Sequence, residues 1–245
     1  MNGISFLMMQ PVLMAAAPAG AAGEFETDVL PTAAGDLKVT FIGHASLLLQ
    51  FGGKAIYNDP VGQFGDFSAL PKADLILAAH DHFDHFDLDT IGKLSKAGTQ
   101  VVMTPLCADK LPGGIVLKNG QETTVAGIRI EAVPAYNLVH MRSPGVPYHP
   151  QGAGNGYVLT FGDKRVYIAG DTENIPEMKH LKAIDYAFLP MNLPYTMTPE
   201  MVADAVRMFK PKVLYPYHTT DTDVSRLKPL LKDEHGIEVR VRRMP

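Results

Sequence analysis

A single hexapeptide, His-Asp-His-Phe-Asp-His at residues 80–85, constrains this chain more than any other stretch. The apolar run 75–79 before it predicts a buried strand, and Asp87 after it predicts the N-cap of a helix. The hexapeptide therefore lies on a strand-to-helix loop, where α/β proteins place their chemistry. Three imidazoles and two carboxylates so close together would be costly to bury without a positive partner, and a metal ion is the simplest one.

The pattern HxHxDH on this strand and loop resembles the metal-binding signature of the metallo-β-lactamase superfamily. The resemblance implies that His80 and His82 hold a first metal ion, while Asp84 and His85 hold a second. Imidazole and carboxylate groups suit such coordination chemically. A solvated polar loop is the alternative interpretation of the same residues.

Two parts of the chain, residues 37–104 and 154–218, repeat one order of expected elements: a hairpin, a strand, a helix and a strand. Phe51-Gly-Gly-Lys-Ala-Ile-Tyr is followed by Asp59, and Phe161-Gly-Asp-Lys-Arg-Val-Tyr is followed by Asp171. Two similar halves would pack as two sheets face to face with helices outside. This α/β arrangement is the four-layer αββα sandwich that the resemblance implies, with its site along the edge between the halves. Chance similarity of short glycine-turn hairpins is the alternative.

Other elements follow from local signals. Thr198 as N-cap and Pro199 in the first turn predict a helix that stops at Lys210 before Pro211. We also expect strands within 121–133, a long loop over 135–155, a helix near 222–234 and a last strand over 237–241.

Two further candidate ligands follow strands of the second half. Gly170-Asp171-Thr172 resembles the superfamily turn whose aspartate bridges both metals, although taken alone such a residue is an ordinary turn aspartate. A bridging anion is needed because two cations about 3.5–4 Å apart repel each other. His218 stands where the family places the last histidine of the second metal site, beside Asp84, His85 and Asp171.

The third histidine of the first site is harder to assign from the sequence. Many relatives supply it in a VPAxH-like segment, but this chain has Val133-Pro-Ala-Tyr-Asn137. Tyr148-His149-Pro150, with the glycines that follow, resembles the HPxGxGxGY version of lactonase-like and other metal-dependent hydrolases. We therefore favour His149 over His140.

Three more residues receive provisional roles. His44 resembles a strand-end histidine of the branch that includes the N-acylphosphatidylethanolamine phospholipase D enzymes, and we expect it to line the pocket as a catalytic or supporting group. A buried structural histidine fits equally well. Asp59 is expected to hydrogen-bond a ligand histidine, or else to be a turn residue before a proline. We expect the loop over 135–155 to form a lid, in which Arg142 could pair with a phosphate or a carboxylate. The alternative is a packing loop whose Arg142 faces water.

The expected chemistry is metal-dependent hydrolysis. Two divalent metal ions, Zn²⁺ first and Mn²⁺ or Fe as alternatives, would generate a bridging hydroxide that attacks a small ester, lactone or phosphoester, and Asp84 could accept a proton. The rival interpretations are a metal-binding protein without turnover and a diiron redox protein of the same fold. Diiron relatives usually show a glutamate where His82 stands and carry a flavin domain.

The charge composition of the chain limits the kinds of partner that it can bind. The formal net charge is −4 and the sequence has no basic run, which argues against a nucleic-acid partner and leaves a small-molecule substrate. Cys107 is the one cysteine, so an internal disulfide is impossible, and we expect it in the core on a helix after Pro105. Beyond the N-terminus, no stretch has the roughly 20 apolar residues that span a bilayer. The oligomeric state is left open.

The first 23 residues are set apart from the rest. Their apolar run, followed by alanines and glycines, resembles a secretory signal peptide, although the usual basic start is missing. Export to the periplasm or beyond is the expectation, and a floppy tail on a cytoplasmic protein is the alternative. Residues 24–245 are expected to form the hydrolase-like domain.

Overall fold

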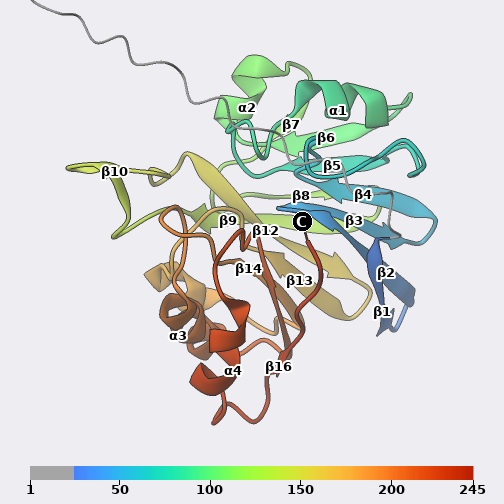
Figure 1. Ribbon diagram of the computed structural model, residues 1–245. Helices are drawn as coiled ribbons and strands as arrows, with labels where there is room; N and C mark the ends of the chain where they lie inside the picture. Colours follow the sequence, from blue (N-terminus) through green and yellow to red (C-terminus); the bar gives the residue numbers. More distant parts are fainter. Residues whose placement is uncertain (1–24, 245) are drawn as a thin grey trace, which may run out of the picture.

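The computed structural model describes residues 25–244, so the expected signal peptide or tail at 1–23 lies outside the described residues. Two seven-stranded mixed sheets pack against each other, and helices cover both outer faces (Figure 1). The first sheet is covered by α1 (Leu88–Leu94) and α2 (Pro105–Lys110), and the second by α3 (Pro199–Phe209) and α4 (Leu227–Leu230). The predicted αββα sandwich is confirmed.

The first sheet has the order β1-β2-β3-β4-β5-β6-β7. Its strands are β1 (Glu26–Thr32), β2 (Gly35–Gly43), β3 (Ser46–Phe51), β4 (Lys54–Asn58), β5 (Leu75–Ala78), β6 (Gln100–Met103) and β7 (Ile115–Val116). Neighbours are antiparallel from β1 to β4 and parallel from β4 to β7. The turn between β3 and β4 uses Gly52 and Gly53, both with positive φ, as the sequence predicts.

The second sheet has the order β16-β15-β14-β13-β12-β9-β8. Its strands are β8 (Glu122–Val125), β9 (Ile128–Ala135), β12 (Gly154–Phe161), β13 (Lys164–Ile168), β14 (Tyr186–Pro190), β15 (Val213–Tyr217) and β16 (Glu238–Val239). In each sheet an antiparallel hairpin leads into parallel strands, β3–β4 in the first and β12–β13 in the second. The repeated order of elements is therefore a property of the fold.

This topology brings four polar segments to one edge. Asp59 follows β4, residues 80–85 follow β5, Asp171 follows β13 and His218 follows β15. Each segment leaves the carboxyl end of a strand that pairs with a parallel neighbour. Parallel strands place these ends together, so side chains far apart in sequence meet at the seam between the sheets.

The core between the sheets is mostly aliphatic and contains a group of packed aromatic rings. Phe188 and Tyr215 stack with ring centroids 4.8 Å apart, and Phe41 of the facing sheet lies 5.3 Å from Tyr215. All three side chains are almost completely buried. Cys107 lies buried on α2, as expected.

Three expectations need correction. The helix predicted over 222–234 is reduced to η2 (Val224–Arg226) and the short α4; Pro229 has no N–H, so the α-helical hydrogen bond back to Ser225 is missing where η2 meets α4. The last strand covers only the two residues of β16. The loop over 135–155 contains a small hairpin, β10 (Met141–Ser143) with β11 (Val146–Pro147), which projects from the body (Figure 1).

Two other observations complete the architecture. A 3-10 helix, η1 (Pro176–His180), lies between β13 and β14. Among residues 25–244, no helix has the length and apolar character needed to cross a membrane.

Replacing Phe188 with alanine tests how far the fold depends on this layer. Phe188→Ala should lower the free energy of unfolding by about 3–5 kcal/mol, because it leaves a cavity between two sheets that cannot collapse freely. The control is Val29→Ala, since the Val29 side chain is 58% exposed and its removal should change little. Urea unfolding measures both, and equal effects would contradict the assignment of the core.

Candidate metal centre

The loop that carries the hexapeptide is tight. It begins after β5 and ends at Asp87, whose carboxylate accepts hydrogen bonds from the N–H of Asp89 and Thr90 and caps α1. Inside the loop, the N–H groups of His85 and Phe86 both donate to the carbonyl of His82, at 3.1 and 2.9 Å. These bonds leave the histidine side chains directed to the seam.

One cluster consists of His80, His82 and His149. One nitrogen of each ring lies within 4.8 Å of the others, and His80 and His149 are buried. The sequence favours His149 over His140 for this position, and the structure brings His149 beside the other two rings. The cluster could hold one metal ion with three nitrogen ligands.

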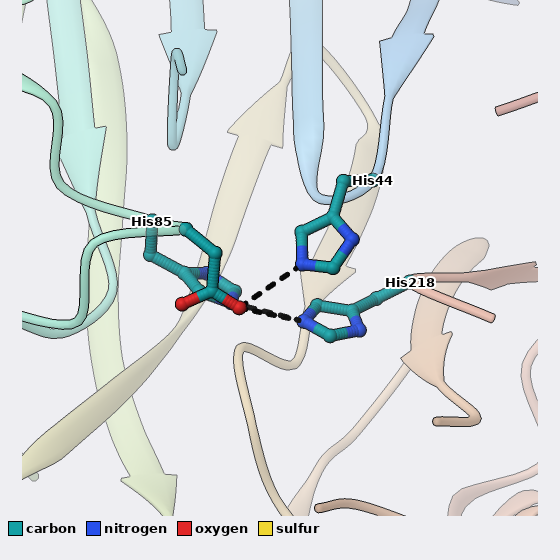
Figure 2. A group of neighbouring side chains, drawn as sticks. His44, His85 and His218 are labelled. Carbon is teal, nitrogen blue, oxygen red and sulfur yellow. Dashed lines mark hydrogen bonds and ion pairs between the residues drawn. The ribbon is translucent and has the colours of Figure 1, made fainter. Parts of the chain in front are cut away.

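A second cluster consists of His44, Asp84, His85 and His218, with ligand atoms again within 4.8 Å of one another. His44 and His218 point to the same carboxylate (Figure 2), and their Nε2 atoms lie 3.2 and 3.8 Å from Oδ2 of Asp84. Nε2 of His218 also lies 3.1 Å from Nε2 of His85. Two ring nitrogens facing each other need a proton or a metal ion between them.

Asp171 lies between the two clusters. Its Oδ2 is 3.2 Å from Nε2 of His149, and its Oδ1 is 3.3 Å from Nε2 of His85 and 3.5 Å from Nε2 of His218. Each oxygen of one buried carboxylate therefore faces a different cluster. This is the arrangement that a carboxylate shared by two cations requires.

The donor atoms fit metal ions. Nε2 of His80 and Oδ1 of Asp171 are buried and have no hydrogen-bond partner among the described residues. Burial lowers the pKa of His80, and it lowers the pKa of His218 to about 4, so both rings are neutral at pH 7. Burial also disfavours a charged His85, but the carboxylates of Asp171 and Asp59 outweigh it and raise the His85 pKa. Neutral imidazoles beside buried carboxylates suit Zn²⁺, Mn²⁺ or Fe.

Asp59 fixes the orientation of His85, as expected. Its Oδ2 lies 2.8 Å from Nδ1 of His85, and its Oδ1 accepts a hydrogen bond of 2.8 Å from the N–H of Ala79. A carboxylate accepts only, so Nδ1 of His85 carries a proton and the ring directs Nε2 to the cluster, where its lone pair would be available to a bound metal ion.

Asn137 performs the same task for His149. Its Oδ1 accepts hydrogen bonds from the backbone N–H of His149, at 2.8 Å, and from its Nδ1, at 2.7 Å. Its Nδ2 donates to Oε1 of Glu173 and to the carbonyl of Tyr195, which fixes the orientation of the amide. Asn137 therefore positions the histidine that comes after it on the loop, instead of supplying a nitrogen itself.

Glu173 is the residue that sequence reasoning missed. Its buried carboxylate accepts from the backbone N–H groups of Leu138, Val139 and His140, each at 2.7 Å. Nδ1 of His140 lies 2.8 Å from its Oε1, so His140 faces Glu173 and belongs to neither cluster. An acidic residue directly after the Gly170-Asp171-Thr172 turn was the available signal.

Three non-glycine residues at the seam have left-handed backbones. The φ angles are +52° for His44, +40° for Asp59 and +49° for His218. The N–H of His218 donates to the carbonyl of His44 at 3.1 Å, which joins the two halves at this point. Such strain persists only where the surroundings enforce it, and it is concentrated at functional sites.

A cavity of about 260 Å³ opens beside the first cluster. Its walls combine the clustered histidines and Asp171 with residues of the hexapeptide loop, of α2, of the hairpin and of the segment that follows it: Asp81, Leu106, Arg142, Val146, Pro147, Tyr148, Pro150, Ala153 and Gly154. A substrate in this cavity would contact the histidines directly.

Comparisons with known proteins agree with this geometry. Residues 38–218 match the family model of the beta-lactamase superfamily domain. A UPF0173 metal-dependent hydrolase of Thermus thermophilus is 33% identical over 216 residues, which are 84% of this chain and 92% of that protein. The chain belongs to the UPF0173 family of metal-dependent hydrolases.

Two solved structures are similar to this hydrolase in sequence and in fold. A crystal structure of a protein from Parabacteroides distasonis ATCC 8503 is 49% identical, with a TM-score of 0.86 over 90% of this chain and 100% of that one. Igni18, a metallo hydrolase from Ignicoccus hospitalis, is 25% identical, with a TM-score of 0.70 over 85% of this chain and 95% of its own. This chain thus shares its fold with both structures, and its histidine and aspartate clusters lie at the seam between the two sheets.

Glu173→Gln tests the network behind His149. The glutamine side chain would place an NH₂ group where a carboxylate oxygen now accepts from backbone N–H groups, so at least one buried donor would lose its acceptor. We therefore expect the free energy of unfolding to fall by about 2–4 kcal/mol. Glu177→Gln is the matched control, because Glu177 is only partly buried and accepts just the hydroxyl of Tyr136. If the two variants unfold at the same urea concentration, Glu173 does not anchor the loop.

Proposed function

We propose that this hydrolase uses two divalent metal ions, Zn²⁺ first among them, to cleave a small ester, lactone or phosphoester. The observation that carries the proposal is Asp171, whose two oxygens face the two clusters. When bound, the ions supply a hydroxide nucleophile at neutral pH and polarise the bond under attack.

The proposed ligands divide between the clusters. His80, His82 and His149 hold the first ion, and Asp84, His85 and His218 hold the second, with Asp171 shared between them. The family's metal dependence and the chemistry of these donors support this division. Zinc suits a site of imidazoles and carboxylates without thiolate.

Asp84 and His44 are proposed to handle protons. Burial disfavours the ionised form of Asp84, but the hydrogen bond from His44 and the charges of His85 and His218 together outweigh it and hold the Asp84 pKa below its usual range. The carboxylate is therefore ionised at neutral pH and can accept a proton as the nucleophile attacks. His44, at 3.2 Å, orients it.

Location is a separate proposal. We infer from the apolar and small-residue pattern of residues 1–23 that the protein is exported and that this segment is removed.

Metal removal tests the proposal directly. Protein purified under native conditions should contain two metal ions per chain by elemental analysis. Dialysis against a chelator should abolish hydrolysis of 4-nitrophenyl pentanoate, dihydrocoumarin or bis(4-nitrophenyl) phosphate, and added Zn²⁺, Mn²⁺ or Fe²⁺ should restore it. If the protein contains its full complement of metal but hydrolyses no ester, lactone or phosphodiester, it is a metal-binding protein without turnover. If an Asp84→Ala variant that still holds metal is as active as the parent, Asp84 has no part in the mechanism.

A pair of histidine variants tests the first site. His149→Ala should weaken binding of one metal ion by about 100-fold or more, since removing even a supporting residue typically costs 10–100-fold. His140→Ala should leave metal affinity close to that of the parent, because His140 faces Glu173 instead of the cluster. Competition with a fluorescent chelator measures both affinities, and the reverse ranking would overturn the assignment.

A further inference from the structure

The cavity beside the first cluster extends well past the histidines. It continues from His80 and His149 to the hairpin formed by β10 and β11. Leu106, Val146 and Tyr148 make its outer wall largely apolar. Pockets for drug-sized ligands measure roughly 300–1,000 Å³, so a cavity of about 260 Å³ suits a small molecule with an apolar body.

Arg142 is the cation among the residues that line this cavity. Its guanidinium carbon lies 5.9 Å from the centre of the Tyr148 ring, and Tyr148 packs edge-on against Tyr195 with centroids 5.0 Å apart. Asp81, also in the wall, is paired with Lys110 at 2.7 Å. Within residues 25–244, no carboxylate pairs with Arg142, so its charge is available to a ligand.

Arg142 lies on the exposed hairpin at an irregularity of its pairing. The pairing register of β10 and β11 shifts between Met141 and Ser143, so Arg142 lies in a bulge. Bulges re-aim a side chain and are frequent beside active sites. At the base of the hairpin, Glu173 binds the backbone N–H groups of residues 138–140, which ties the hairpin to the turn that carries Asp171.

We propose that the substrate's apolar body carries an anionic group, a carboxylate or a phosphate, that pairs with Arg142 while the scissile bond lies at the histidine clusters. This rests on the proposed hydrolytic function and names its substrate class. Guanidinium groups bind carboxylates and phosphates through paired, charge-assisted hydrogen bonds. Two bound divalent ions would offset the formal net charge of −4, so the protein as a whole attracts an anion little and recognition depends on this local contact.

Binding of three matched probes tests the anionic subsite without turnover. Hexanoate, hexyl phosphate and 1-hexanol are each built on one linear chain of six carbon atoms, and calorimetry on the metal-loaded protein gives a Kd for each. In Arg142→Gln, the ratio of the 1-hexanol Kd to the hexanoate or hexyl phosphate Kd should fall about tenfold. Arg129→Gln, which removes an equal charge from the far end of β9, should keep the parent ratio. The anion with the larger loss identifies the group that Arg142 recognises.

Turnover of two esters gives the second measurement. Mono-4-nitrophenyl glutarate carries a distal carboxylate, and 4-nitrophenyl pentanoate has the same acyl length without it. The parent should prefer the glutarate in kcat/KM, and Arg142→Gln should lose about tenfold of that preference, mainly through KM. Arg142→Lys should recover part of it.

The outcomes separate this inference from the proposed function. Unchanged probe ratios in Arg142→Gln would overturn the anionic subsite, because the anions would then be binding at the metal ions alone. If neither ester is hydrolysed by metal-loaded protein, the ester chemistry fails, and the probe ratios alone decide the subsite. Hydrolysis of pentanoate with an unchanged preference in Arg142→Gln would leave the hydrolytic function standing and exclude Arg142.

Discussion

Three carboxylates are buried at the seam between the sheets, and their negative charge determines which groups must lie around them. Asp59, Asp171 and Glu173 have almost no contact with solvent. Each would be costly to bury alone: Asp59 is paired with His85, Glu173 accepts from three backbone N–H groups, and Asp171 faces histidine nitrogens from both halves. Asp171 is the least satisfied of them, since its Oδ1 has no hydrogen-bond partner among residues 25–244. That imbalance is what makes the seam a place for cations.

The halves contribute unequally to this seam. The first supplies the hexapeptide in a single loop, whereas the second supplies Asp171 and His218 from the ends of two strands. His149 comes from the segment before β12 that carries the hairpin. The internal repeat therefore explains the two sheets but not the site, which depends on how the chain departs from the repeat.

Much of the architecture could be predicted because its signals are local. Gly52 and Gly53 mark a hairpin, and Asp87 marks a helix start, from neighbours only. The network behind His149 could not be predicted, because Asn137 and Glu173 are 36 positions apart and meet only after β9 and β13 join the same sheet. For the same reason Asn137 resembled a lost ligand, when its amide orients one. The shortened C-terminal helix shows a different error, because the prediction of a helix near 222–234 did not take account of Pro229 within that range.

The left-handed backbones of His44, Asp59 and His218 have a consequence for engineering. Glycine would adopt those angles without steric cost, whereas each non-glycine residue there stores roughly 1 kcal/mol or more. Glycine at position 59 would also remove the acceptor of the N–H of Ala79 and of Nδ1 of His85, and glycine at position 44 would remove the contact with Asp84. Relief of backbone strain is therefore set against the loss of buried hydrogen bonds, so an attempt to stabilise this protein should leave these positions unchanged.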